Sequence, residues 1–226
     1  MKYSVHGQES VVYRNDKRFR LLITAGPTQE PLDPVRFISN YSTGTMGYFL
    51  ARQAQKLGYK VILISGPVNL PLPEGVKYIP VKTAEEMYRE TRKFFLKSDC
   101  LIMTAAVCDF RPAKLSQQKI KKRKYLNLKL VQTRDILCEM GKIKGKRVIV
   151  GFALETENLI KNSREKIKDK NMDLIIANKV NRRESPFGKN NLKPFFIFKD
   201  GTMQKIAVSS KSRLARTILR KIEMIR

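Results

Sequence analysis

Short apolar runs alternate along the chain with segments in which apolar residues recur every third or fourth position. The runs are Leu21–Ala25, Val61–Ser65, Cys100–Ala106, Val148–Ala153 and Leu174–Ala177, with a further short run at Val76–Val81. A continuous apolar run is typical of a strand that is covered on both faces. Because helical segments separate these strands, the pattern predicts an α/β fold, with a mostly parallel sheet and helices on both faces.

Helix signals stand between the predicted strands. Residues 46–57 place apolar side chains at i, i+3 and i+4 spacing, which predicts an amphipathic helix. Thr83 is followed by Glu86 at the capping-box position, which predicts the start of a second helix. We expect Thr133 to cap a short helix over Asp135–Met140.

Residues 107–125, called the basic flap below, interrupt the alternation. They are rich in lysine and arginine, and Asp109 is the acid among them. Leu126, Leu128 and Leu130 then alternate with polar residues, which predicts a half-exposed strand. We therefore expect a mobile basic flap that leaves the sheet and returns to it.

The last part of the chain predicts a hairpin and a helix. An irregular stretch, Asn181–Lys193, comes first. The expected hairpin strands are Phe195–Phe198 and Met203–Ile206, with Asp200-Gly201 in the turn. Ser209 or Ser210 is expected to cap the last helix.

The length of 226 residues suits one α/β domain. We divide the chain into an N-terminal leader, residues 1–19, and a single domain, residues 20–226. No apolar run approaches the ~18 to 20 residues that span a membrane, and the first residues lack a signal-peptide core. The three cysteines show no C-x-x-C spacing, which is typical of a reducing compartment. We therefore expect a cytoplasmic protein without a membrane partner.

Histidine usage and charge narrow the function classes. His6 is the single histidine and lies outside the periodic region, which argues against a Ser-His-Asp triad, a Cys-His pair and a His-rich metal centre. The net charge of +26 is compatible with nucleic-acid binding, with capture of small polyanions or with a solvated basic surface. Because no helix-turn-helix, RNP strand or zinc finger accompanies the charge, the sequence argues against a dedicated nucleic-acid partner.

The segment from Leu21 to Gly47 carries the strongest functional signal. A buried strand leads into a polar loop, and the glycine-bounded run Ser42–Gly47 then opens a helix. Unpaired backbone N–H groups and the helix dipole favour phosphate at such a start. The spacing matches neither G-x-G-x-x-G nor G-K-[ST], and an ordinary capped helix is the alternative interpretation.

The amino-acid sequence of this segment resembles that of one enzyme family. GPT-x-E-x-x-D-P-V-R-F-I-S-N followed by S-T-G-x-M-G is similar to the phosphopantothenoylcysteine synthetase family of coenzyme A synthesis. The resemblance extends over roughly residues 20 to 226 and recurs in ordered blocks. These blocks are VILISGPVNLP, MTAAVCDFRPA, QKIKK, GFALETE and DLIIAN. The resemblance implies a Rossmann-like sheet with a basic flap and a C-terminal hairpin. It also implies a homodimer.

The resemblance also implies the reaction. The family joins 4′-phosphopantothenate to L-cysteine through an acyl-nucleotide, with release of pyrophosphate. The resemblance implies CTP as the activating nucleotide, with ATP as the alternative, and Mg²⁺ held by the phosphates of the nucleotide. About 19 residues precede the first predicted strand, so we expect no fused flavin-dependent decarboxylase domain. A separate phosphopantothenoylcysteine decarboxylase is then the expected pathway neighbour.

Two residues are predicted to act in catalysis. The resemblance implies that Asn40 serves the acyl-nucleotide intermediate, and its amide is able to donate and accept without being acylated. An Asx-turn or a cap is the structural alternative for Asn40. Lys119 matches the family's flap lysine, which is implicated in the second half-reaction. Closing the basic flap would exclude water from the intermediate.

The resemblance assigns other residues to substrate and nucleotide. Arg36, Ala105, Ala106 and Asp109 are predicted to bind substrate, with Arg36 reaching across a dimer interface. The predicted nucleotide-binding residues are Gly26, Ser42, Gly44, Gly47, Asp109, Lys119, Thr133, Arg134, Asp135, Ile136, Phe152, Lys166, Lys170 and Asn178. An ion pair with Arg111 is the structural alternative for Asp109, and a solvated helix face is the alternative for Lys166 and Lys170. Metal ligands are not assigned.

The sequence departs from the family pattern at three places. Thr45 stands where the family often has a cation, Thr133-Arg134-Asp135 replaces a common N-P-D, and the loop at residues 187–191 is shorter.

A nicotinamide-linked oxidoreductase would show G-x-G-x-x-G after the first strand, which this chain lacks. A nucleic-acid-binding protein would be indifferent to Asn40 and Lys119 and would show steep salt dependence.

Overall fold

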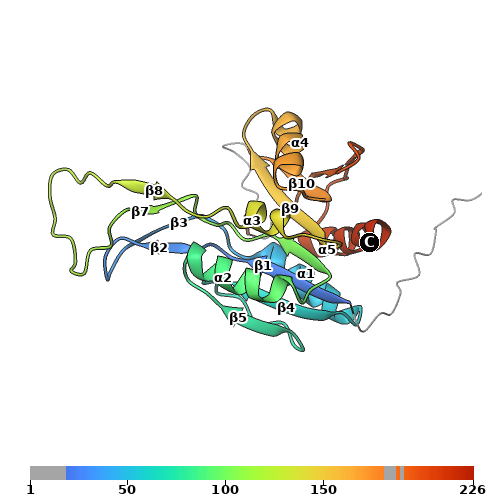
Figure 1. The fold of residues 1–226 in the computed structure, drawn as a ribbon, viewed down its shortest axis with the longest axis horizontal. Coiled ribbons are helices and arrows are strands. Elements are labelled where there is room, and N and C mark those ends of the chain that lie inside the picture. Colours follow the sequence, from blue (N-terminus) through green and yellow to red (C-terminus); the bar gives the residue numbers. More distant parts are fainter. Residues whose placement is uncertain (1–18, 181–186, 189–190) are drawn as a thin grey trace, which may run out of the picture.

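One eight-stranded sheet organises the protein (Figure 1). The computed structural model describes residues 19–180, 187–188 and 191–226. In spatial order the strands are β5 (Lys77–Pro80), β4 (Lys60–Ser65), β1 (Arg20–Ala25), β6 (Cys100–Met103), β9 (Val148–Glu155), β10 (Leu174–Lys179), β11 (Phe195–Phe198) and β12 (Met203–Lys205). All pairs from β5 to β10 are parallel, and β11 and β12 add antiparallel strands at the edge. The predicted Rossmann-like sheet is confirmed.

Helices cover both faces of the sheet, as expected. α1 (Thr45–Lys56) and α5 (Lys211–Ile225) pack on one face, and α2 (Ala84–Phe95), α3 (Ile136–Lys142) and α4 (Leu159–Asp169) pack on the other. Side chains along β1 alternate between the two cores, with Leu21 and Ile23 on the α1 side and Leu22 on the α2 side. Because both sides are buried, the strand is apolar throughout rather than alternating.

The helix starts follow the sequence signals with one exception. Thr83 and Glu86 form the predicted capping box of α2, and Ser210 caps α5 through the N–H of Arg213. The cap of α3 is Asp135, whose Oδ1 accepts from Cys138 N at 3.0 Å. The prediction of Thr133 as this cap was wrong, because the Thr133 hydroxyl donates to the Cys108 carbonyl instead.

Two small hairpins extend to one side of the sheet, at the left of Figure 1. They pair β2 (Gln29–Pro31) with β3 (Phe37–Ser39), and β7 (Phe110–Pro112) with β8 (Leu130–Gln132). We call these four strands, the turn 32–36 and the loop 113–129 the arm, which includes most of the basic flap. The strand predicted for residues 126–130 was wrong for Leu126 and Leu128, which precede β8 in irregular chain.

The sequence-based boundaries hold elsewhere with small shifts. The run Cys100–Ala106 leaves the strand after Met103, because the Ala106 N–H and carbonyl bond to the loop after β1, at Gly26 and Thr28. The predicted hairpin forms as β11 and β12. The predicted leader lies outside the described residues up to position 18, as does most of the predicted irregular stretch Asn181–Lys193.

Candidate active site

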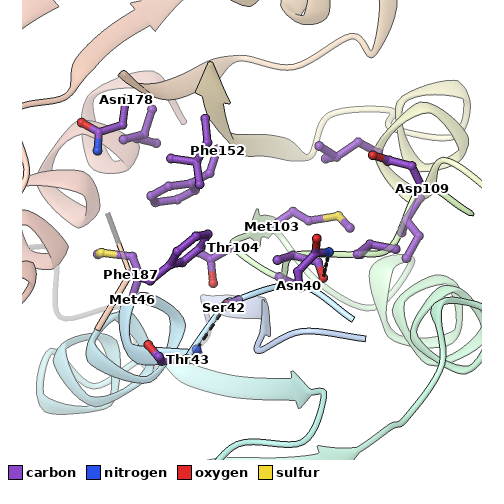
Figure 2. A pocket seen from close by; sticks show the side chains of 18 of the residues that line it. Asn40, Ser42, Thr43, Met46, Met103, Thr104, Asp109, Phe152, Asn178 and Phe187 are labelled. Carbon is purple, nitrogen blue, oxygen red and sulfur yellow. Dashed lines mark hydrogen bonds between the residues drawn. The ribbon is translucent and has the colours of Figure 1, made fainter. Parts of the chain in front are cut away.

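A cavity of about 450 Å³ opens at the carboxyl ends of the central parallel strands (Figure 2). It lies where the strand order reverses, since the chain leaves β1 towards β4 and leaves β6 towards β9. Ligands bind at this switch point in open α/β sheets, because the loops diverge there and leave a crevice. Main-chain and side-chain groups of both crossover units line it, including Met46, Met103 and Phe152.

The floor is the loop between β1 and α1, and glycines allow its close approach to the sheet. Gly26 and Gly44 adopt positive φ angles of 73° and 72°, and Gly44 is the N-cap of α1. A Cβ at Gly47 would lie 2.6 Å from both Ala25 Cβ and Thr104 Oγ1. The first turn of α1 therefore sits directly on the strand ends. Gly44, Thr45 and Met46 line the cavity, so the N-terminal end of α1, where the first N–H groups lack partners within the helix, lies at the cavity.

Asn40 lies at the cavity with its amide oriented by two contacts. Its Nδ2 donates to the Ala106 carbonyl at 3.0 Å (Figure 2). The same Nδ2 lies 3.8 Å from Cys108 Sγ. Cys108 is buried, and its thiol also contacts the Thr28 and Ile38 carbonyls. Burial raises the pKa of the Cys108 thiol, so it stays protonated and serves as packing beneath the amide.

The start of α3 forms another wall with paired charges. The Arg134 guanidinium stacks 4.3 Å from the Tyr88 ring centre, and its Nε lies 3.8 Å from Glu85. Lys170 Nζ lies 2.8 Å from Asp135. Burial acts to raise the pKa of Asp135, but hydrogen bonds from Lys170 and the Cys138 N–H hold it below its usual value. This wall therefore carries little uncompensated positive charge.

The opposite end of the cavity contains a lysine that the sequence interpretation missed. Lys211 lines the cavity from the first turn of α5, and its Nζ donates to the Gly188 carbonyl at 2.6 Å. The Gly188 N–H donates to Thr43 Oγ1 at 3.2 Å, which links this segment to the start of α1. Burial lowers the pKa of Lys211 to about 8. A lysine directly after a helix cap, against the dipole preference, was the available sequence signal.

The cavity gathers most of the residues predicted from the sequence. Those that line it are Asn40, Ser42, Gly44, Ala105, Ala106, Asp109, Thr133, Arg134, Asp135, Ile136, Phe152, Lys170 and Asn178. Five others do not line it: Gly26, Arg36, Gly47, Lys119 and Lys166. Gly26 and Gly47 lie behind the floor and permit its geometry. Lys166 Nζ lies 2.5 Å from Glu155 Oε1 in an ion pair between α4 and β9.

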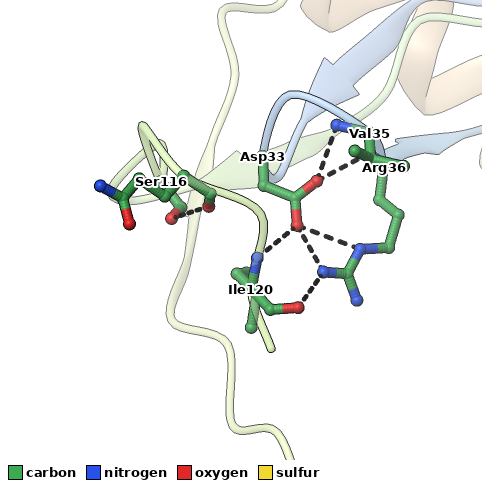
Figure 3. Close-up of polar contacts among 6 residues, drawn as sticks. Asp33, Val35, Arg36, Ser116 and Ile120 are labelled. Carbon is green, nitrogen blue, oxygen red and sulfur yellow. Dashed lines mark hydrogen bonds and ion pairs between the residues drawn. The ribbon is translucent and has the colours of Figure 1, made fainter. Parts of the chain in front are cut away.

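Arg36 and Lys119 lie on the arm. Asp33 accepts hydrogen bonds from the N–H groups of Val35, Arg36 and Ile120, and Arg36 Nη2 lies 2.5 Å from its Oδ2 (Figure 3). Arg36 Nη2 also donates to the Ile120 carbonyl at 2.6 Å. Burial alone would raise the pKa of Asp33, but the hydrogen bonds from Ile120, Val35 and Arg36 hold it well below its usual range. This cluster fixes the flap residues beside Lys119 to the turn between β2 and β3.

Two features are absent from the described part of the chain. No group of three or more His, Cys, Asp or Glu side chains gathers there as a metal cluster. Within the same residues, none of the helices combines the length and apolarity of a membrane span.

Residues 17–225 match the family model of the DNA/pantothenate metabolism flavoprotein C-terminal domain. The chain is 44% identical over 204 residues to the coenzyme A biosynthesis bifunctional protein CoaBC of Bacillus subtilis, covering 89% of this chain and 50% of the relative. The same bifunctional protein of Borreliella burgdorferi is 42% identical over 208 residues, with 90% and 52% coverage. The chain thus spans about half the length of these curated relatives.

A solved structure shares the fold at significant identity. The crystal structure of the C-terminal domain of a coenzyme A biosynthesis bifunctional protein CoaBC superposes with a TM-score of 0.77 at 38% identity. The match covers 91% of this chain and 94% of that domain.

Proposed function

Because the chain belongs to the DNA/pantothenate metabolism flavoprotein C-terminal domain family, we propose that it is a phosphopantothenate–cysteine ligase of coenzyme A synthesis. It joins 4′-phosphopantothenate to L-cysteine and forms phosphopantothenoylcysteine. One observation carries the proposal: a single cavity brings Asn40, the pair Ala105-Ala106, Asp109 and the start of α1 together. These residues come from separate blocks of the sequence and meet only through the fold.

The reaction needs activation of a carboxylate. A carboxylate oxygen of phosphopantothenate attacks the α-phosphorus of the nucleotide, the bond to the bridging oxygen breaks, and pyrophosphate leaves. The amine of cysteine then attacks the acyl carbon, and the nucleoside monophosphate departs with the electron pair of the acyl–oxygen bond. Such chemistry requires positioning and charge stabilisation rather than a protein nucleophile.

The cavity residues supply those two requirements. Backbone N–H groups at the first turn of α1, together with the hydroxyls of Ser42 and Thr43, suit phosphate oxygens. Asn40 is held by Ala106 and Cys108, so its amide keeps one orientation beside the acyl group. The small side chains of Ala105 and Ala106 leave room for the pantothenate chain at the end of β6.

CTP is the proposed activating nucleotide, as implied by the bacterial pattern of the motifs. Mg²⁺ is proposed as its companion ion. The hydroxyl oxygens of Ser42 and Thr43, which line the cavity beside the start of α1, would suit a hard cation shared with phosphates. Bound there, the ion would neutralise polyphosphate charge.

A homodimer is proposed from the arm. Its surface exposes large apolar side chains: Val35, Phe37, Phe110, Leu115, Tyr125, Leu126, Leu128 and Leu130. Exposed large apolar side chains gathered on one segment favour an association site. Arg36 and Lys119 lie on the arm rather than in the cavity of their own chain. We therefore propose that the arm of one copy brings both residues to the cavity of a second copy.

The test is a mass-resolved assay with phosphopantothenate, Mg²⁺ and either CTP or ATP, with and without cysteine. The wild type is compared with Asn40→Ala and Lys119→Gln, and Lys114→Gln on the same exposed flap is the matched control. Cysteine-dependent product with CMP release supports the proposal, and an acyl-cytidylate accumulating in Lys119→Gln assigns that lysine to the second step. Absence of both product and pyrophosphate from folded wild type with either nucleotide would overturn it.

Mixing the two inactive variants tests the dimer arrangement. If Lys119 serves the second copy, a mixed dimer contains one cavity with both residues intact. Activity should then reappear on mixing Asn40→Ala with Lys119→Gln, up to about a quarter of the wild-type rate for random exchange of subunits. No recovery from demonstrably mixed dimers would place Lys119 in its own chain's site.

A further inference from the structure

Lys211 is an unusual residue for its position in the fold. Only 6% of its surface is exposed, and it stands at the first turn of the 15-residue helix α5. Burial disfavours an ammonium ion, and so does the positive end of a helix dipole. The hydrogen bond to the Gly188 carbonyl offsets part of this cost. A lysine buried at a cavity wall is suited to a negatively charged ligand.

The two ends of the cavity differ in charge. Asp109 and Asp135 lie at the α3 end, where Lys170 is already paired with Asp135. The apolar side chain of Ile136, in the first turn of α3, belongs to that end as well. Carboxylates suit ribose hydroxyls, and apolar walls suit a base, whereas both would disfavour a polyphosphate.

The other end offers donors and positive charge. Ser42, Thr43 and Gly44 lead into α1, and neither α1 nor α5 has an acidic residue in its first turn. Thr43 and Lys211 are joined through Gly188, so the two helix starts face the same part of the cavity. Helix N–H groups, hydroxyls and an ammonium group together match phosphate oxygens.

We propose that Lys211 binds the terminal phosphates of the nucleoside triphosphate, which become the leaving pyrophosphate. The base and ribose then lie towards α3, and the α-phosphate lies between, next to Asn40. This assignment rests on the proposed ligase function and gives the direction of the nucleotide in the cavity. When the bond between the α-phosphorus and the bridging oxygen breaks, pyrophosphate takes the electron pair, and Lys211 neutralises the added charge while keeping its proton.

Direct binding measurements test the proposal without requiring turnover. Affinities of CTP and CMP, or of ATP and AMP if ATP is the nucleotide bound, are measured by calorimetry for wild type and Lys211 variants. Lys211→Met removes both the charge and the bond to Gly188. Lys211→Gln removes the charge but keeps a donor for the Gly188 carbonyl, and Lys211→Arg keeps the charge. Arg216→Met, on the exposed face of the same helix, is the control for loss of one positive charge.

The expected result is a loss confined to the triphosphate. CTP affinity should fall about 10- to 100-fold in Lys211→Met and Lys211→Gln, as for loss of a charge-assisted hydrogen bond, while CMP affinity changes less than about twofold. Lys211→Arg and Arg216→Met should retain CTP affinity. If Lys211→Met does not fold, the Gln and Arg variants carry the same comparison.

Three outcomes would overturn the inference. Wild-type CTP affinity in Lys211→Gln would mean that Lys211 only holds Gly188. An equal loss of CTP and CMP affinity would mean that Lys211 shapes the cavity without contacting the terminal phosphates. If wild type binds neither CTP nor ATP, the proposed function fails, and the inference fails with it.

Discussion

Replacing Gly47 with alanine tests whether close packing or helix propensity governs the start of α1. In an exposed helix, alanine is more stable than glycine by about 1 kcal/mol. At Gly47 the new Cβ would lie 2.6 Å from Ala25 Cβ and Thr104 Oγ1, and 3.2 Å from the Thr24 carbonyl oxygen. Ordinary contacts between carbon atoms are about 3.5–4.0 Å, so α1 would have to move outwards by roughly 1 Å.

The magnitudes decide the sign of the effect. Overpacking a core position typically costs about 1–3 kcal/mol, which exceeds the gain in helix propensity. We expect Gly47→Ala to lower the free energy of unfolding by about 1–2 kcal/mol, measured by urea denaturation. Because the same movement shifts Ser42 and Gly44 at the cavity, nucleotide affinity should fall as well.

A matched pair of variants isolates the packing contribution. Arg216 lies on the exposed face of α5, so Arg216→Ala should be more stable than Arg216→Gly by about 1 kcal/mol. Opposite signs at positions 47 and 216 would establish that the strand ends dictate glycine at the start of α1. If Gly47→Ala proves as stable as wild type or more so, the close approach of α1 to the sheet does not constrain this position.

Three further predictions concern stability and reactivity. Lys144→Met should destabilise the fold by about 2 kcal/mol or more in urea denaturation, because it leaves the Asp173 carboxylate without the buried ammonium that lies 2.5 Å away. Combining Lys144→Met with Asp173→Asn should recover part of this loss in stability. Asp33 has a lowered pKa in the folded state, so its stabilisation is present above the unfolded pKa of about 4 and is lost as pH falls below it. Asp33→Asn should therefore be less stable than wild type at pH 7. The difference between the two unfolding midpoints should become smaller at about pH 3, and a difference that became larger at low pH would contradict this prediction. In the native protein, Cys138 should react with iodoacetamide faster than the buried Cys108, as measured by peptide mass spectrometry. Equal rates of reaction would show that Cys108 is accessible.

The central parallel strands β1, β4, β6, β9 and β10 were predictable because each contains a continuous apolar run. The Asp200-Gly201 turn and the Thr83–Glu86 capping box were predictable because local hydrogen bonding fixes them. The arm was largely unpredictable. Its strands at Gln29–Pro31 and Phe110–Pro112 are too short for a periodic pattern, and each ends at a proline.

Some cavity residues were predictable from the sequence pattern, and others depend on how the helices pack. Ala105 and Ala106 follow the end of β6, and Asn178 lies near the end of β10. The carboxyl ends of parallel strands meet at one edge of the sheet whatever the loops do. The ion pairs of Lys166 with Glu155 and Lys170 with Asp135 depend on how α4 packs, which a linear pattern does not contain. Lys211 reaches the cavity only because α5 returns to the face that carries α1.

The return of α5 to the α1 face has a consequence for synthesis of the protein on the ribosome. Leu50 and Ala54 of α1 share a buried core with Leu214 and Ile218 of α5, and the edge hairpin β11–β12 immediately precedes that helix. While residues 211–225 remain in the exit tunnel, this face of the nascent sheet stays uncovered and open to chaperones. Folding of this layer therefore completes only after its last helix emerges, and early release of the chain would leave an apolar surface open to aggregation.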